Sequence, residues 1–198
     1  MKNFEAITNQ TYTFGNCNIC DARCCDGSRG STFSQLILSD FEVVFKNFPI
    51  VFLLGELGYL KPVVLLSNGK GFCRYIKDMK CVIYDERPSV CKLYPLSPHL
   101  DNKTYIDTTC PAVNELGNPI TKEGVVQKDF FHKSLIGYQD KYIDTHNHFE
   151  QFNNKNYLEE VITINENIFY KFKEHFNDDF IKMHLNSLHH IDDYFTTT

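Results

Sequence analysis

The stretch Cys17-Asn18-Ile19-Cys20-Asp21-Ala22-Arg23-Cys24-Cys25 gathers four of the chain's eight cysteines into nine residues. The other four follow at wider intervals, at Cys73, Cys81, Cys91 and Cys110. Thiolates are soft metal ligands, and a tight run of them can converge on one centre without long excursions of the backbone. The pattern predicts a metal site in the first part of the chain, with irregular loops organised around it.

Disulfides are the alternative use of an even number of cysteines in a small secreted protein. The N-terminal segment 1–11 is polar and lacks the apolar core of a secretory signal, and no apolar run approaches the length of a membrane span. We therefore expect a reduced, cytoplasmic protein without a membrane partner. A chain of 198 residues can also build a core without covalent staples, so metal is favoured over disulfides.

The charge of the chain argues against a nucleic-acid partner. The net charge is −5, without long blocks of one sign. Nucleic-acid binding depends mainly on the neutralisation of phosphates by Lys and Arg, and this composition offers no such footprint. The length predicts one compact domain, or one domain with a helical extension.

In the first half of the chain the pattern predicts two helices and a strand. Ser39-Asp40 is a plausible N-cap for a helix that carries apolar residues at helical spacing over 41–48. A second short helix is expected over 50–57. The β-branched run 62–66, followed by Asn68-Gly69, predicts a strand and a tight turn.

Cys91 is expected one turn into a short helix. Pro88 suits the first turn of a helix because its missing N–H is not needed there, and Asp85 just before it is a reasonable cap. A strand over 104–107 is then expected to lead to Cys110, where the following proline stiffens the approach to the metal.

The last part of the chain predicts a helical hairpin. Seven apolar residues share a helical face, namely Leu158, Val161, Ile162, Ile168, Phe169, Phe172 and Phe176. Asn177-Asp178 then caps a second helix that continues to Ile191. The predicted fold class is α+β, mostly helical with a short β-hairpin. It comprises an irregular cysteine-rich metal-binding domain over 1–124 and a helical extension over 125–198 packed on it.

Four segments of the chain resemble the bacterial and archaeal YkgJ-like cysteine-cluster family, which is described as a zinc- or iron-chelating domain. They are Cys17-x-x-Cys20-x-x-x-Cys24-Cys25, Gly71-Phe72-Cys73, Cys81-Val82-Ile83-Tyr84 and Arg87-Pro88-Ser89-Val90-Cys91-Lys92-Leu93-Tyr94-Pro95. The resemblance covers about residues 15–111. The joint occurrence of the double cysteine and the later I-Y-x-x-R-P-x-x-C pattern is more specific than a lone C-x-x-C. The same domain is similar to part of flagellin lysine-N-methylase, which implies a methyltransferase-like enzyme as an alternative.

Eight thiols can form two sets of four. Cys24 and Cys25 are adjacent, so in extended backbone their side chains would point apart and serve two neighbouring centres or two sides of a larger cluster. A 4Fe-4S cluster and a structural zinc ion each take four cysteines. The irregular intervals between the later cysteines favour iron–sulfur. Arg87 has two readings: it tunes the centre as a cofactor-binding residue, or it satisfies local carbonyls before Pro88.

Three functions follow from this site. The first is an iron–sulfur protein with an electron-transfer or sensing role, the second a protein with purely structural zinc, and the third a lysine methyltransferase-like enzyme that uses S-adenosylmethionine. No dinucleotide-binding, P-loop, zinc-protease or nucleophile motif occurs in the sequence, so no catalytic residue is assigned. A protein partner is left open.

Overall fold

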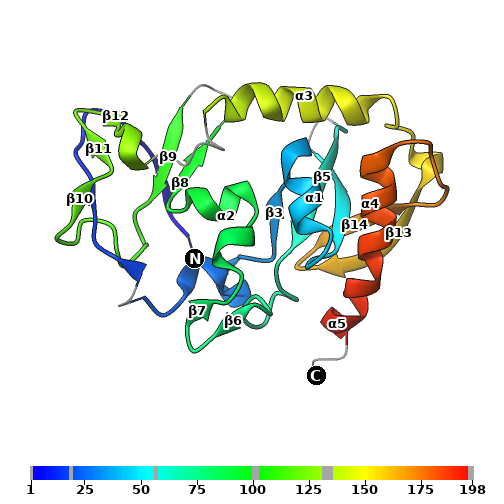
Figure 1. Cartoon of the computed structure of the whole chain (residues 1–198), viewed down its shortest axis with the longest axis horizontal. Coiled ribbons are helices and arrows are strands. Elements are labelled where there is room, and N and C mark those ends of the chain that lie inside the picture. Colours follow the sequence, from blue (N-terminus) through cyan, green and yellow to red (C-terminus); the bar gives the residue numbers. More distant parts are fainter. Residues whose placement is uncertain (1, 18–19, 56–57, 100–102, 131–135, 196–198) are drawn as a thin grey trace.

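The computed structural model describes residues 2–17, 20–55, 58–99, 103–130 and 136–195. The strands described there form five antiparallel sheets (Figure 1). In spatial order, the largest sheet contains β13 (Leu158–Ile164), β14 (Asn167–Phe172), β4 (Ile50–Leu54), β5 (Leu60–Leu65) and β3 (Phe33–Gln35). A three-stranded sheet contains β1 (Phe4–Ala6), β9 (Thr104–Asp107) and β8 (Leu96–Pro98). The two-stranded pairs are β10 (Asn118–Pro119) with β2 (Thr13–Phe14), β11 (Thr121–Lys122) with β12 (Val125–Val126), and β6 (Ile76–Lys77) with β7 (Lys80–Cys81).

The helices are mostly short. The α-helices are α1 (Phe41–Val44), α2 (Ser89–Leu93), α3 (Tyr138–Glu150), α4 (Asp179–Ser187) and α5 (Asp192–Phe195). Within the described residues, the 3-10 helices are η2 (Arg23–Cys25), η3 (Gly27–Arg29), η4 (Leu38–Asp40), η5 (Tyr84–Glu86), η6 (Lys128–Phe130), η8 (Lys155–Tyr157) and η9 (Leu188–Ile191). The prediction of a mostly helical fold with one short hairpin is therefore wrong, because strands of five sheets run through the described chain.

The predicted helix over 158–176 is instead the β-hairpin of β13 and β14. The two strands pair antiparallel from Leu158 opposite Phe172 to Ile164 opposite Asn167. The turn residues Asn165 and Glu166 both have positive φ, at 47° and 68°, which is the backbone of a tight two-residue hairpin. The run Val161-Ile162-Thr163-Ile164 is β-branched throughout, and that stiffness favours a strand over a helix.

The expected helix over 50–57 is also wrong. Ile50–Leu54 forms the central strand β4, which pairs with β5 on one side and with β14 on the other. Its first three residues are buried, as befits a strand covered on both faces. Residues 56 and 57 lie outside the described residues.

Other sequence predictions are confirmed. The strand expected over 62–66 overlaps β5, and the strand expected over 104–107 is β9. A short helix, α1, follows Ser39-Asp40, and α2 follows Pro88 and contains Cys91. The carboxylate of Asp178 accepts a hydrogen bond from the backbone N–H of Ile181 at 2.9 Å and caps α4 as expected.

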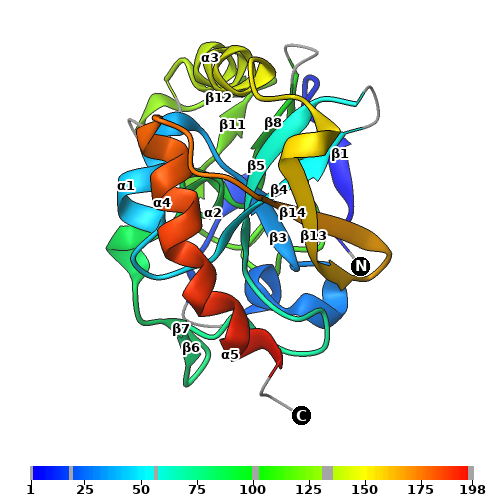
Figure 2. The ribbon, with the colours of Figure 1, turned by 90° about the vertical axis from the view of Figure 1, so that its right-hand side faces the viewer.

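The large sheet and the three-stranded sheet are bridged by α2, which packs against β3 of the first and β8 of the second. On the large sheet, α4 packs against β4 and β14, and α3 packs against β5 and runs along the top of the molecule in Figure 1. Figure 2 shows α4 lying across one face of that sheet. Strands on both sides of residue 124 enter the large sheet, and the domain boundary expected there stays a prediction. Among the described helices, none has the length and apolar character needed to cross a membrane.

Candidate metal centre

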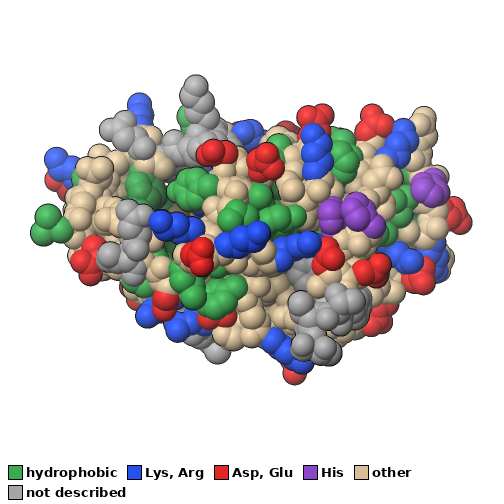
Figure 3. Space-filling model, turned by 60° about the horizontal axis from the view of Figure 1, so that its bottom comes forward, with side chains coloured by type: hydrophobic (Ala, Val, Ile, Leu, Met, Phe, Trp, Pro, Cys, Tyr) green, Lys and Arg blue, Asp and Glu red, His purple; other side chains and the backbone are tan. Residues whose placement is uncertain are grey.

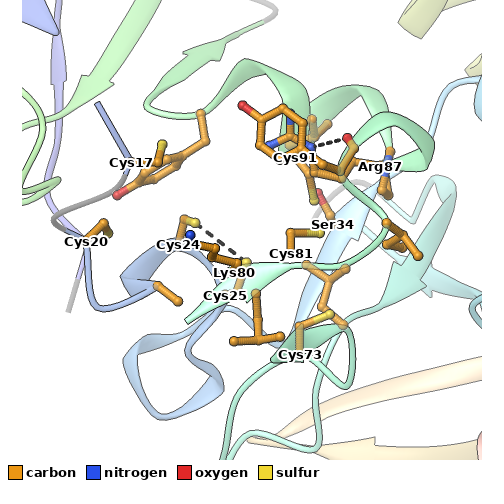
Figure 4. Close-up of a pocket in the computed structure, with 18 of the residues that line it drawn as sticks. Cys17, Cys20, Cys24, Cys25, Ser34, Cys73, Lys80, Cys81, Arg87 and Cys91 are labelled. Atoms are coloured by element: carbon orange, nitrogen blue, oxygen red, sulfur yellow. Dashed lines mark hydrogen bonds between the residues drawn. The ribbon is translucent and has the colours of Figure 1, made fainter. Parts of the chain in front are cut away.

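Seven of the eight cysteines line one cavity of about 400 Å³ (Figure 4). They come from the N-terminal loop with η2, from the segment around β6 and β7, and from α2: Cys17, Cys20, Cys24, Cys25, Cys73, Cys81 and Cys91. Residues of β3 and β8 complete the wall, so the cavity lies between the two larger sheets. The structure thus gathers most of the predicted ligand set in one place.

Cys110 does not line this cavity. It is 5% exposed and belongs to a separate hydrophobic cluster that includes Tyr12, Leu96 and Ile106. Tyr94 packs against that cluster and also lines the cavity. The ligand role predicted for Cys110 stays a prediction. The charge of Cys20 contributes to raising the pKa of Cys110, after burial, so the two thiols lie within electrostatic reach of each other.

Backbone hydrogen bonds hold two of the cysteine segments together. The N–H of Cys73 donates to the carbonyl of Cys25 at 2.8 Å, and the N–H of Gly27 donates to the carbonyl of Gly71 at 2.8 Å. A side chain at position 27 would collide with the hydroxyl of Ser67, so this close approach requires glycine. The result is that the double cysteine lies beside Cys73, although some fifty residues separate them in the sequence.

The hairpin of β6 and β7 brings Cys81 back toward Cys73. Ile76 pairs with Cys81, and the turn residues Asp78 and Met79 have positive φ values of 48° and 59°. A two-residue turn with positive φ at both positions has a backbone twist that matches the right-handed twist of the antiparallel strands on either side. A tight turn therefore connects the two strands between Cys73 and Cys81.

Cys91 is positioned from a distant part of the chain through the start of α2. The carboxylate of buried Asp40 accepts hydrogen bonds from the N–H of Ser89 at 3.0 Å, from the Ser89 hydroxyl at 2.6 Å and from the N–H of Ile37 at 3.2 Å. The cap expected from Asp85 is wrong, because Asp40 accepts the hydrogen bonds at this helix start. The sequence predicted Ser39-Asp40 only as a cap for the helix that directly follows it, and the long-range role of Asp40 at α2 was missed.

The adjacent cysteines do not point apart. Residues 23–25 form the 3-10 helix η2 instead of extended backbone, and the Sγ atoms of Cys24 and Cys25 lie 3.6 Å apart. Two thiolates on one tetrahedral ion with metal–sulfur bonds of about 2.3 Å lie about 3.8 Å apart. The expectation that these two side chains serve opposite centres is therefore wrong in its geometry, and one ion can take both sulfurs.

Burial contributes to raised pKa values of four cavity thiols, those of Cys17, Cys24, Cys73 and Cys91. It raises the pKa of Cys91 to about 12 and that of Cys73 to about 11, with smaller contributions from neighbouring cysteines. The pKa of Cys24 is also raised, first by its hydrogen bond with Cys25 and then by burial. A metal ion that binds here must release these protons, so metal affinity increases with pH.

Three cations line the cavity, Lys2, Lys80 and Arg87, and none of the described lining residues is Asp or Glu. This sign is opposite to the net charge of the chain, −5. The charges of Lys2 and Arg87 lower the pKa values of Cys24 and Cys91 and partly oppose the effect of burial. The positive side chains of the wall therefore favour the deprotonated, negatively charged form of these two thiols.

The contacts of Arg87 match the second of its two predicted roles, in which it satisfies local carbonyls before Pro88. Its Nε donates to the carbonyl of Tyr84 at 2.6 Å, and its guanidinium carbon lies 3.4 Å from the centre of the Tyr84 ring. The same side chain lines the cavity, so its charge still acts on the thiols. The cation Lys2, 5.4 Å from the centre of the Tyr94 ring, was missed because nothing in the sequence links residue 2 to the cysteines.

The donor set fits a soft metal centre in its chemistry and its location. In the described part of the chain, however, no three His, Cys, Asp or Glu side chains form a group that could hold a metal ion as they stand. The thiols are thus gathered around one cavity without being drawn to ligand distances.

The cavity reaches the surface beside hydrophobic side chains. Met79 and Tyr84 line it and are 50% and 55% exposed, and Val82 between them is 53% exposed. Figure 3 shows a face on which hydrophobic side chains gather in patches beside lysines and arginines, with acidic side chains interspersed. That face carries charges of both signs.

Comparisons of the chain with protein-family models, with curated proteins and with solved structures found no match. The resemblance to the YkgJ-like family therefore stays a prediction from the cysteine pattern.

Proposed function

We propose that this protein binds a soft metal centre through the thiols of the cysteine cavity and uses it in electron transfer or sensing. The observation that carries the proposal is the meeting of seven cysteines from three separate segments around one cavity. All eight cysteines are free thiols, which fits a reducing, cytoplasmic compartment. The exposed hydrophobic side chains at the rim offer a contact surface for a protein partner.

Zinc is the form of the centre that the geometry supports best. The 3.6 Å between the sulfurs of Cys24 and Cys25 suits two ligands of one tetrahedral ion. In a cubane cluster each cysteine binds a different iron, and its terminal thiolates diverge. Iron–sulfur is the second candidate, favoured by the irregular spacing of Cys73, Cys81 and Cys91.

The methyltransferase-like alternative rests on the family resemblance. Among the described residues, the only further support for this alternative is the cavity volume, which is within the range of small-molecule sites. Methyl transfer is therefore not proposed as the function.

Anaerobic purification followed by metal and sulfide analysis tests the proposal. We expect colourless protein with bound zinc, and Cys91→Ser should lower the metal content because it removes a buried ligand. His190→Ala is the matched control and should leave the metal content unchanged, since that side chain does not line the cavity. Brown protein with iron and acid-labile sulfide would replace zinc by the second candidate. Metal-free protein with intact disulfides would contradict the proposal itself.

A further inference from the structure

The wall of the cysteine cavity changes in character between the solvent and the interior. Its cations lie nearer the solvent, since Lys80 is exposed and Lys2 and Arg87 are half-buried. Its deepest apolar lining residues are between 2% and 7% exposed, namely Phe48, Leu66 and Leu96. The cavity is therefore amphipathic, with positive charge toward its mouth and apolar surface inside.

We propose that this cavity binds an amphiphilic organic anion, namely a small carboxylate with an apolar body. The inference goes beyond the proposed function and does not depend on it, because cations and apolar side chains make the contacts instead of sulfur–metal bonds. Small-molecule sites have volumes of about 300 to 1,000 Å³ and combine a mainly apolar lining with a few polar groups. The cavity, at about 400 Å³, has this composition. A wholly polar anion such as inorganic phosphate would leave the apolar interior in contact with water.

The described residues provide no carboxylate partner for these three cations. The ion pairs between described side chains involve other lysines, arginines and histidines. The amino group of Lys2 instead lies 5.4 Å from the centre of the Tyr94 ring, and Arg87 donates to a backbone carbonyl. Their positive charge is therefore available to an anion that enters from the solvent.

Two of the cations act on the same part of the cavity, although they are far apart in the sequence. The charges of Lys2 and Arg87 both influence Cys24 and Cys91, so both cations lie within electrostatic reach of these thiols. Figure 4 shows Lys80 and Arg87 in the wall, from β7 and from the turn before α2. A cleft lined by charges of one sign attracts the opposite charge, even though the whole chain carries −5. A carboxylate head group can be held here while its apolar body fills the interior.

Calorimetric titration of the full, reduced, metal-free chain at pH 7 tests the site with octanoate, octanol and octylamine, which share one chain length and differ in charge. Octanoate should bind more tightly than octanol, although a carboxylate is harder to desolvate than a hydroxyl, and octylamine should bind most weakly. Hexanoate should bind about 10- to 20-fold more weakly than octanoate, because it lacks two buried methylenes. Octanoate should also slow the alkylation of the cavity cysteines by iodoacetamide, mapped by mass spectrometry.

Charge variants locate the head group. Lys80→Gln and Arg87→Gln should each weaken octanoate binding by about 2- to 5-fold, as expected for a solvent-exposed ion pair, and leave octanol binding unchanged. Arg87→Lys, which keeps the charge, should keep the affinity. Lys77→Gln is the matched control, because Lys77 pairs with Lys80 across the same hairpin but does not line the cavity. Lys80 is exposed, so its replacement should leave the fold intact.

Several outcomes would overturn the anion site. Octanol that binds as tightly as octanoate, an equal loss in Lys77→Gln and Lys80→Gln, or unchanged alkylation of the cavity cysteines would each do so. Inorganic phosphate that binds as tightly as octanoate would reject the apolar body of the ligand. Zinc binding is measured separately, so a chain that binds zinc but not octanoate would overturn this inference alone. A chain that binds octanoate but no metal would contradict the proposed function and leave this inference standing.

Discussion

Asp40 connects an early part of the chain to the helix that carries Cys91. Its carboxylate is buried and accepts hydrogen bonds from Ser89 and Ile37. Burial raises the pKa of this carboxyl, and the three hydrogen bonds oppose that effect. The buried carboxyl of Asp40 therefore fixes the start of α2 through its hydrogen bonds to Ser89.

Asp40→Ala should destabilise the protein by about 1 to 3 kcal/mol and weaken metal binding. The change leaves the buried N–H groups of Ser89 and Ile37 without their acceptor, and such groups carry the full cost of desolvation. Urea denaturation and zinc titration measure the two effects. Asp85→Ala is the control, because exposed Asp85 was the cap expected from the sequence and its loss should cost less than about 0.5 kcal/mol. A larger cost for Asp85→Ala than for Asp40→Ala would reverse the assignment.

At the scale of elements, His184 joins α4 to two strands of the large sheet. The N–H of Phe172 in β14 donates to its Nε2 at 3.2 Å, and its Nδ1 donates to the carbonyl of Ile50 in β4 at 2.7 Å. A neutral imidazole with one donor and one acceptor satisfies both contacts. Burial lowers the pKa of His184 to about 4.

The stability of the fold should therefore decrease as the pH falls from about 6.5 to about 4. In that window the unfolded chain binds a proton at His184 and the folded chain does not, which favours unfolding. Wild-type protein should lose up to about 3 kcal/mol more across this window than His184→Gln, as measured by urea denaturation of metal-free samples. His189→Gln should follow the wild type. An equal pH dependence in His184→Gln would show that another group is responsible.

The β13 and β14 hairpin should depend strongly on Phe172. This side chain is 1% exposed, and its ring centre is 5.0 Å from that of Phe52 and 5.5 Å from that of Phe176. Phe172→Ala should cost about 3 to 5 kcal/mol in chemical denaturation, because it leaves a cavity between the sheet and α4. Ile168→Ala, on the same strand but 40% exposed, should cost clearly less. Equal costs would mean that the strand packs differently.

At the scale of the whole molecule, the cavity sits where the two larger sheets meet, so metal binding and folding should be coupled. Chelation of the metal at pH 7 should lower the Tm by about 5 to 10 °C, the shift expected when a ligand at 100 times its Kd is removed from a chain of this size. Differential scanning calorimetry measures it. The Tm of Cys24→Ser should respond less to the chelator. A wild-type Tm that does not change would separate the metal site from the stability of the fold.

Local sequence signals predicted the elements that depend on neighbours in the chain. The cap at Asp178, the strand before Asn68-Gly69 and the short helix after Pro88 were all predicted, because capping and turn preferences act within a few residues. The hairpin of β13 and β14 was missed because its apolar residues also fit a helical period. Its β-branched run and the Asn165-Glu166 turn were the signals that could have identified it.

The cysteine pattern alone predicts thiols in a number and spacing that suit a soft metal. Contacts between distant segments determine which of these thiols meet. The backbone bond between Cys73 and Cys25, the long-range cap from Asp40 and the position of Cys110 outside the cavity all join or separate residues far apart in the chain. Such contacts form because distant segments bury apolar surface and satisfy each other's hydrogen bonds, and no local pattern encodes that pairing.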